Sequence, residues 1–164
     1  MITTEQVKEL RDKTGVSIMQ CKKALEDAGG DMEKALVLLK KKGAEIASKK
    51  GDRSLGAGVV ASYVHASGNQ GAMVELWCET DFVAKNEEFK ALARDIAMQV
   101  TATNPEFLSI EDLGATPEDK DRVLLEQPFI KDGDITVGQM ISNAVQKFGE
   151  KIEVGKFARF STAR

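Results

Sequence analysis

The chain has 164 residues, of which 42% are hydrophobic, 30% charged and 5% aromatic, a balance that excludes a disordered chain. The formal charge is −3, and residues 1–54 carry 12 Lys and Arg against 9 Asp and Glu, too small an excess to predict direct binding of nucleic acid. The two cysteines, Cys21 and Cys78, form no CxxC motif, which excludes a zinc ribbon or a dithiol redox site.

The opening residues lack a basic segment followed by an apolar one, and the sequence contains no run of about 18 apolar residues. We therefore expect neither a signal peptide nor a membrane span. Two unpaired cysteines suit a reducing compartment. Together these features predict a cytoplasmic protein.

Residues 1–43 are predicted to form three short helices. Thr3 and Gln6 have the spacing of a capping box, in which two residues at a helix start hydrogen-bond to each other's backbone. Ser17 and Gln20 repeat that spacing, which predicts the same motif at the start of the second helix. Three amphipathic helices in so short a span indicate a small bundle that resembles a ubiquitin-associated (UBA) domain.

The third helix is expected to start at Asp31, a good N-cap, and to end at Gly43. Residues 44–55 are interpreted as a joint, in which a helical segment over 44–50 leads to a solvated linker. From residue 56 the pattern changes. The expected domains are therefore a UBA-like module at 1–43, the joint at 44–55, and a core at 56–164.

The core begins with two alternating segments, Ala57–Ala66 and Ala72–Glu79, which predict strands. Gly68 and Asn69 between them are turn residues, so the two strands should form a hairpin with one buried face. On the second strand the buried face is expected to hold Ala72, Val74, Leu76 and Cys78.

A helix is predicted after Asn86 up to Asn104, and a second one from Thr136 to Gly149 with Gln139 in capping-box position. Residues 105–135 show no clear periodicity, and the sequence does not indicate whether they are ordered. The last segment, 151–161, alternates like a strand but slips in phase near Gly155, which predicts a bulge. The fold class is therefore α+β, a UBA-like bundle followed by a small antiparallel sheet layered with helices.

Candidate catalytic residues are few. His65 is the only histidine, so a catalytic triad and a multi-histidine metal site are excluded. The segment from Gly149 to Lys156 has the wrong spacing for a phosphate-binding loop and lacks its Ser or Thr. Cys21 beside Lys22 is either a structural residue or a nucleophile with a lowered pKa. We expect no catalytic residue, no metal and no cofactor, and therefore no enzyme.

The segment Glu79–Asn86, with the sequence ETDFVAKN, resembles a signature of the elongation factor Ts family. A second resemblance lies near the N-terminus, where Arg11, Thr14 and Gly15 precede Met19 and the string CKKAL. Both motifs occur in the expected order, and further similarity appears in the QPF string at 127–129 and in 156–160. The resemblance covers nearly the whole chain.

The resemblance implies a guanine nucleotide exchange factor for elongation factor Tu, a protein GTPase of translation elongation. In this family the TDFV element enters the GTPase domain beside its magnesium ion. This assigns partner binding and magnesium displacement to Thr80, Asp81, Phe82 and Val83. The other interpretation of Phe82 is a residue of the hairpin core.

The resemblance also implies that the N-terminal module docks on the partner, with Thr14, Gly15 and Met19 as contacts. Core packing is the other interpretation of Met19. Long members of the family have two copies of the core and an inserted helical hairpin near 115–127, whereas this chain resembles a short form with one copy. Two chains are then expected to form a homodimer through their sheets. The alternative function is a UBA-like adaptor that binds a polypeptide without exchange activity.

Overall fold

The computed structural model describes residues 1–49, 51, 53–112 and 114–163. Lys50 and Asp52 of the expected joint, and Leu113 of the aperiodic segment, lie outside these residues. The chain divides into two compact units. The first consists of Met1–Arg53 and Ser142–Lys151, and the second of Ser54–Ile141 and Ile152–Arg164.

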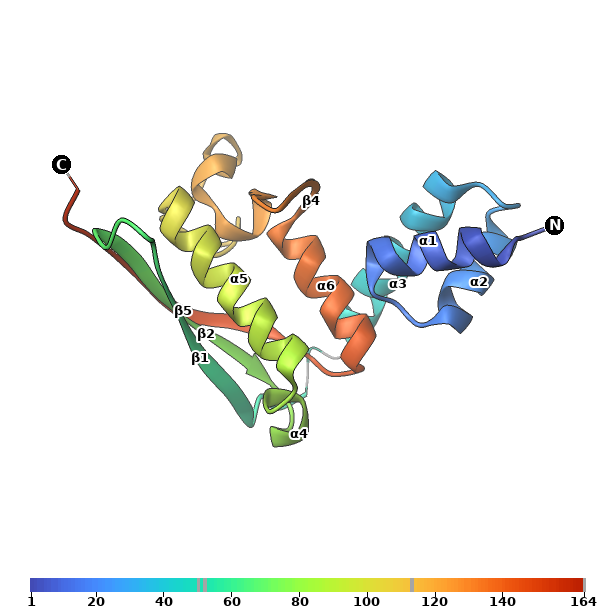
Figure 1. Ribbon diagram of the computed structural model, residues 1–164, viewed down its shortest axis with the longest axis horizontal. Coiled ribbons are helices and arrows are strands. Elements are labelled where there is room, and N and C mark those ends of the chain that lie inside the picture. Colours follow the sequence, from blue (N-terminus) through green and yellow to red (C-terminus); the bar gives the residue numbers. More distant parts are fainter. Residues whose placement is uncertain (50, 52, 113, 164) are drawn as a thin grey trace. The chain divides into compact units, whose positions relative to one another are not determined.

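The first unit contains three helices, α1 (Thr4–Thr14), α2 (Ile18–Asp27) and α3 (Met32–Lys49), shown in blue to cyan in Figure 1. The capping box at the start of α1 is confirmed, because Gln6 N donates to Thr3 Oγ1 over 3.2 Å and Thr3 N donates to Gln6 Oε1 over 2.9 Å. Asp31 caps α3 through Lys34 N at 3.1 Å. The core of the bundle consists of Val7, Leu10, Val16, Cys21, Ala24, Leu25, Ala35 and Leu39.

Two details of these helices differ from the prediction. Ser17 Oγ accepts Gln20 N at 3.3 Å, but Gln20 Oε1 is buried and has no partner among the described residues, so only half of the second capping box forms. Gly43 does not end α3, which continues to Lys49. Gly43 is buried within the helix, and a Cβ at this position would lie at an ordinary contact distance of 3.5 Å from Gln146 Oε1.

The second unit is built on a three-stranded antiparallel sheet in the order β1-β2-β5, formed by β1 (Ala57–Val64), β2 (Gln70–Cys78) and β5 (Glu153–Ser161). The predicted hairpin is confirmed, with Ala57 opposite Cys78 and Val64 opposite Gly71. The predicted bulge is confirmed too, since the register between β2 and β5 shifts between Val74 and Leu76. The fold is therefore α+β, as predicted.

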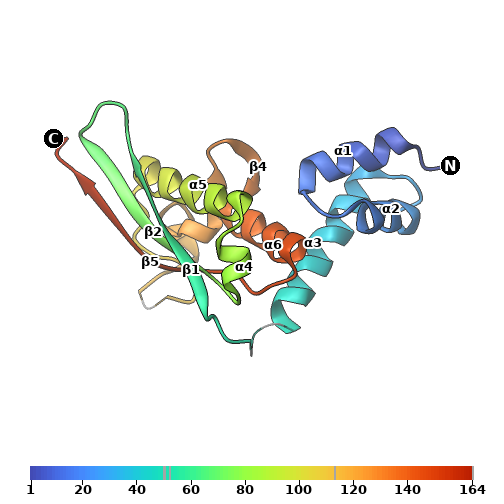
Figure 2. The same cartoon turned by 60° about the horizontal axis from the view of Figure 1, so that its bottom comes forward.

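One face of the sheet is covered by α5 (Glu87–Thr103), which runs along it in both views of the ribbon (Figures 1 and 2). The buried residues of α5 and of the strands share this face: Phe89, Leu92, Ala93, Ile96 and Val100 from the helix, and Ala72, Val74, Leu76 and Val154 from the sheet. Burial of so many aliphatic groups is the main source of stability in this unit.

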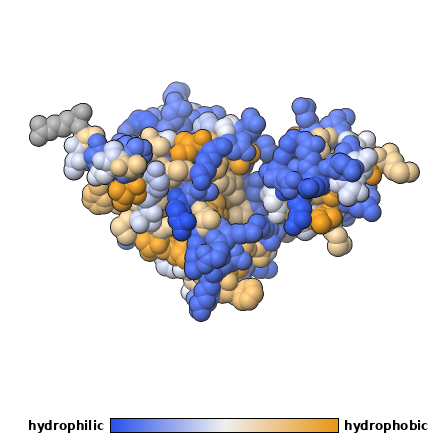
Figure 3. Space-filling model, viewed as in Figure 1, coloured by the Kyte–Doolittle hydropathy of each residue, from blue (hydrophilic) through white to orange (hydrophobic). Residues whose placement is uncertain are grey.

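The other face, called here the outer face, carries no helix within the described part of the chain. Five large apolar side chains are exposed on its strands: Val60, Val64, Met73, Trp77 and Phe160. Figure 3 shows hydrophobic surface, in orange and tan, on the part of the molecule that carries the sheet. Several large apolar side chains exposed on one face of a sheet indicate an interaction surface.

The aperiodic segment after α5 is largely ordered. It contains two 3₁₀ turns, η1 (Pro117–Arg122) and η2 (Leu124–Glu126), then a small hairpin of β3 (Pro128–Phe129) and β4 (Asp132–Thr136). After it, α6 (Val137–Phe148) starts with the predicted capping box between Thr136 and Gln139, at 3.1 Å in both directions.

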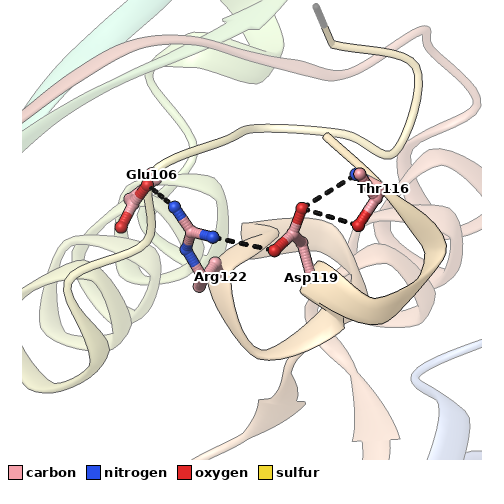
Figure 4. A network of polar contacts seen from close by, with 4 residues as sticks. All are labelled: Glu106, Thr116, Asp119 and Arg122. Carbon is pink, nitrogen blue, oxygen red and sulfur yellow. Dashed lines mark hydrogen bonds and ion pairs between the residues drawn. The ribbon is translucent and has the colours of Figure 1, made fainter. Parts of the chain in front are cut away.

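Figure 4 shows a network of polar contacts within this segment. Asp119 accepts hydrogen bonds from Thr116 N and Oγ1, each at 2.9 Å, and from Arg122 Nη1 at 2.8 Å. Arg122 also pairs with Glu106 through its other terminal nitrogen. The backbone N–H of Thr116 is the largest of the causes that lower the pKa of Asp119. The network therefore ties the start of the segment at Glu106 to η1.

A buried amide network fixes the β3–β4 hairpin to α5. Gln99 is fully buried, and its Nε2 donates to Gln127 Oε1 and to Pro128 O, each at 3.1 Å. Its Oε1 accepts Ile130 N at 2.9 Å. Thr103 Oγ1 donates to the same Gln127 oxygen at 2.8 Å. Each hydrogen-bonding group of Gln99 has a partner, so the network orders a segment that has no periodic pattern of its own.

Replacing Gln99 with methionine should destabilise the chain by about 3 kcal/mol, because the new side chain fills the space but leaves buried donors and acceptors of the hairpin unpaired. Urea unfolding followed by circular dichroism measures the change. The matched control is Gln146→Met. Both side-chain polar atoms of Gln146 are buried without a partner among the described residues, so the same substitution should stabilise by about 1 kcal/mol. Equal effects of the two substitutions would contradict the assigned role of the network.

Candidate functional site

The TDFV segment forms a single helical turn, α4 (Asp81–Ala84), directly after β2. Thr80 is its N-cap, with Oγ1 accepting Val83 N at 3.5 Å and the Thr80 carbonyl accepting Ala84 N at 3.2 Å. Asn86 follows at once as the N-cap of α5, and its side chain accepts Glu88 N at 2.8 Å. The turn is therefore short and bounded on both sides by regular structure.

Burial divides the four residues of the motif into two pairs. Asp81 and Phe82 point outward, and Phe82 is 87% exposed, so the alternative interpretation of Phe82 as a core residue is wrong. Val83 is only 5% exposed and packs inward beside Ala84. The structure thus brings Thr80, Asp81 and Phe82 together at the surface, while Val83, which follows them, is buried and anchors the turn.

This geometry suits a binding element and not a catalytic one. An aromatic ring held in water costs hydration free energy, which a partner pocket recovers when it encloses the ring. The Asp81 carboxylate beside the ring adds a negative charge that can compete for cations or amide donors. A short turn with two buried anchors can present this pair in a fixed direction.

Cys78 was predicted to be a core residue, and the structure shows one further contact. It is fully buried, and its Sγ donates to Thr80 O at 3.3 Å. The alternation of β2 predicts only that Cys78 faces inward. The sequence places Cys78 two residues before the N-cap Thr80, but this spacing alone does not predict a hydrogen bond from the thiol to the Thr80 carbonyl.

The second candidate surface lies in the first unit, at the turn between α1 and α2. Gly15 has φ of 68°, a left-handed conformation that closes α1 and is unfavourable for residues with a Cβ. The Thr14 side chain is buried, donating to Leu10 O at 2.7 Å and accepting Val16 N at 3.3 Å. Thr14 therefore shapes the turn from the inside together with the buried Val16, and the exposed positions are Gly15 and the residues from Ser17 to Met19.

Met19 lies at the start of α2 and is 82% exposed, so its alternative interpretation as a core residue is wrong. Ile18 beside it is 55% exposed. Two apolar side chains in water next to the Gly15 turn form a small patch that can pack against a partner. The structure thus presents Gly15 and Met19 on the surface of the bundle.

The hypothesis that Cys21 is a nucleophile finds no support in its surroundings. Cys21 is fully buried in the bundle core, and its Sγ lies 3.6 Å from Val16 O and 3.9 Å from Thr14 Oγ1. Burial raises the pKa of the thiol, against the smaller opposing effects of Thr14 and Arg11. A buried thiol with a raised pKa is a poor nucleophile at neutral pH.

Within the described residues, no group of three or more His, Cys, Asp or Glu side chains is arranged to hold a metal ion. None of the helices in the described part of the chain combines the length and the apolar character that a membrane span needs.

Comparisons with known proteins place the chain in a family. The family described as Elongation factor TS matches residues 5–122 of this chain. The matched segment contains both motifs, the Gly15 turn with Met19 and the TDFV turn.

Named relatives extend this match over nearly the whole chain. An elongation factor Ts of Desulforamulus reducens is 44% identical, covering 97% of this chain and 88% of the relative. That of Gloeobacter violaceus is 45% identical over the same shares, and that of Thermodesulfovibrio yellowstonii is 41% identical over 99% of this chain and 97% of its own length. The first alignment has 191 positions against 164 residues here, so that relative carries residues without a counterpart in this chain. The chain belongs to the elongation factor Ts family.

Proposed function

We propose that this protein is a guanine nucleotide exchange factor that promotes release of GDP from elongation factor Tu during translation elongation. The observation that carries the proposal is the TDFV turn, in which Phe82 is 87% exposed on an anchored turn. The family assignment supplies the partner. The protein acts by contact in the cytoplasm, without covalent chemistry, and needs no membrane, nucleic acid or cofactor.

In the proposed mechanism, Asp81 and Phe82 enter the GTPase domain beside its magnesium ion, with Thr80 and Val83 at the base of the intruding turn. Phe82 separates packed side chains of the partner, and the shift disturbs the magnesium ligands and the phosphate loop. Magnesium offsets the negative charge of the β-phosphate, so its displacement weakens binding of GDP. Coupling of this kind is reciprocal: GDP weakens binding of the exchange factor by the same factor.

The N-terminal module, residues 1–43, is proposed to dock on the same partner through Gly15 and Met19, with Thr14 holding the turn. The joint at 44–55 leads to the core at 56–164, which carries the TDFV turn. Two attachment points make the second contact an intramolecular event, which raises the local concentration of Phe82 at its target.

A homodimer is also proposed, through the outer face of the sheet. The five exposed apolar side chains there, Val60, Val64, Met73, Trp77 and Phe160, need a partner that is itself apolar and sheet-like. A second copy of this chain offers the same face, and a two-fold axis joins identical patches. This pairing would supply the second core that long members of the family carry in one chain.

The proposed function is tested by loading elongation factor Tu with a fluorescent GDP analogue and following its release after mixing with excess GDP. Catalytic amounts of the full chain should accelerate release, and each molecule should turn over many complexes. Binding without acceleration would instead favour the adaptor hypothesis. If the folded chain neither binds elongation factor Tu nor accelerates release, the proposed exchange function is refuted.

A higher magnesium concentration should slow the accelerated release, because exchange requires displacement of the ion. The control is the spontaneous release measured at the same magnesium concentrations without this protein. The ratio of the two rates should fall as magnesium rises. A constant ratio would contradict the magnesium mechanism while leaving the exchange activity itself intact.

Met19→Ala should weaken binding to nucleotide-free elongation factor Tu by about tenfold, because a buried apolar contact at an interface is lost. Stability should change little, since the side chain is 82% exposed. Isothermal titration calorimetry measures the affinity. Ile130→Ala, an exposed apolar residue of the β3–β4 hairpin, is the control and should bind like the wild type. Equal affinity of both variants would remove Met19 from the docking surface.

A further inference from the structure

Cys78 is linked to the TDFV turn by its side chain as well as by the chain. It is the last residue of β2, paired with Ala57 on β1, and none of it is exposed. Its thiol donates to Thr80 O at 3.3 Å. The same carbonyl accepts Ala84 N at 3.2 Å, the bond that closes the single turn of α4. The sheet and the turn therefore meet at one carbonyl oxygen.

The N-cap hydrogen bond of this turn is long. The N-cap bond from Val83 N to Thr80 Oγ1 is 3.5 Å long, at the limit of a hydrogen bond. A helix of one turn has little cooperative stability of its own. Phe82 is 87% exposed and receives almost no packing that could orient it. The direction of the ring is thus set by the backbone of Thr80 and Asp81, and the Cys78 thiol ties this backbone to the sheet.

We propose that Cys78 is a positioning residue for nucleotide exchange: its thiol, through the Thr80 carbonyl, fixes the direction in which Phe82 is presented to the partner. The inference rests on the proposed exchange function. A wedge that is oriented before contact loses less conformational entropy on entering its target, so each encounter with the partner is more productive.

If Cys78 has only a packing role, its substitutions should rank differently in the rate of GDP release. If the sulfur only fills space in the core, serine is the worst replacement, because it places a hydroxyl in an apolar site, and alanine or valine is tolerated better. If the donated hydrogen bond matters, serine retains it and the two apolar residues lose it. The two roles therefore predict opposite rankings of serine and alanine.

The experiment compares Cys78→Ser, Cys78→Ala and Cys78→Val in the full chain, with GDP release from elongation factor Tu as the readout. Each rate is divided by the folded fraction measured by circular dichroism. The Cys78→Val variant replaces Cys78→Ala in the comparison if too little of the alanine variant folds. The serine variant should stay within about twofold of the wild type, and the apolar variants should lose about three- to fivefold, the range of one neutral hydrogen bond. Serine equal to or slower than alanine would overturn the proposal.

A double-mutant cycle with Phe82→Ala gives a readout that a packing role would not change. The loss caused by Cys78→Ala should disappear in the Phe82→Ala background, because the thiol acts through the ring. Independent losses at the two sites would overturn the positioning role.

Amide hydrogen exchange at Val83 and Ala84 in the free chain separates the two hypotheses. The amide hydrogens of Val83 and Ala84 should exchange faster in Cys78→Ala than in Cys78→Ser. If this difference is observed but the wild type does not release GDP, the proposed nucleotide-exchange function is refuted and the anchoring role of the thiol is supported. Unchanged amide exchange together with active wild-type protein would overturn the anchoring alone.

Discussion

Phe82→Ala should remove most of the acceleration of GDP release from elongation factor Tu while leaving the fold unchanged. The ring is 87% exposed, so its removal takes little packing from the chain and should change the free energy of unfolding by less than about 0.5 kcal/mol. In the complex the same ring would be fully enclosed. The substitution therefore separates function from stability, which substitutions of buried residues such as Val83 cannot do.

The expected loss is about thirtyfold in the rate of catalysed release, equivalent to about 2 kcal/mol, the threshold of an interface hot spot. Stopped-flow release of the fluorescent GDP analogue measures it at several concentrations of the exchange factor. Ile130→Ala is the matched control, because it also truncates an exposed apolar side chain, at 46% exposure, in the same unit. That variant should release GDP at the wild-type rate.

A second comparison distinguishes a wedge from a simple binding contact. If Phe82 acts only in docking, the rate at saturating exchange factor recovers fully in the variant. If it acts as a wedge, the saturated rate itself stays low. A variant that unfolds at a much lower temperature than the wild type would contradict the exposed position of the ring.

The sequence predicts well those elements whose signals are local. Alternation in Ala57–Ala66 and Ala72–Glu79 specifies both strands and their buried face, because a slip of one residue would turn the apolar side chains to water. The capping residues Thr3 and Thr136 mark helix starts because the bonds they make lie within four residues. The phase slip at Gly155 marks the bulge for the same reason, since it breaks the period of a single strand.

The errors arise where distant contacts decide the local structure. Gly43 is a residue typical of a helix end, but it is buried near Gln146, more than a hundred residues later, and α3 continues past it to Lys49. The aperiodic segment is ordered by Gln99, whose amide reaches Pro128 and Ile130. No pattern within either segment contains this information.

In the candidate site, too, the features with local signals could be predicted and those that depend on tertiary contacts could not. Its position after a strand and its exposed aromatic residue could be inferred from the motif and the end of the alternation. The inward side of Val83 and the thiol bond of Cys78 could not, because both depend on how a single helical turn sits on the sheet. The motif identifies which residues matter, and the structure distinguishes the residues that reach outward from those that hold them.

The outer face of the sheet has the second large expected effect. Met73→Lys should convert the proposed homodimer into a monomer. Met73 lies on the central strand β2, opposite Ala158 of β5, and is 49% exposed. It lines a shallow hollow with Val64 and Phe160. A lysine at this position would bury its charge in an apolar interface, and the two-fold axis would place one such charge on each chain.

Because each interface receives two charges, the dissociation constant of the dimer should rise by about a hundredfold or more, or at least about 2.7 kcal/mol. Sedimentation velocity over a range of concentrations measures the change, and thermal unfolding at a concentration where the wild type is monomeric should give nearly equal stability. Met19→Lys is the control, since it adds the same charge at an exposed methionine of the other unit.

The Met73→Lys variant also connects assembly to exchange. If a second core must grip the partner, Met73→Lys should release GDP slowly at concentrations where the wild type is dimeric, and a covalently linked pair of wild-type cores should be fast at any dilution. If one core is sufficient, the monomeric variant remains as fast as the wild type, and the apolar outer face serves assembly only. A wild-type chain that stays monomeric at every concentration would contradict the proposed dimer and leave the TDFV turn as the sole basis of the exchange activity.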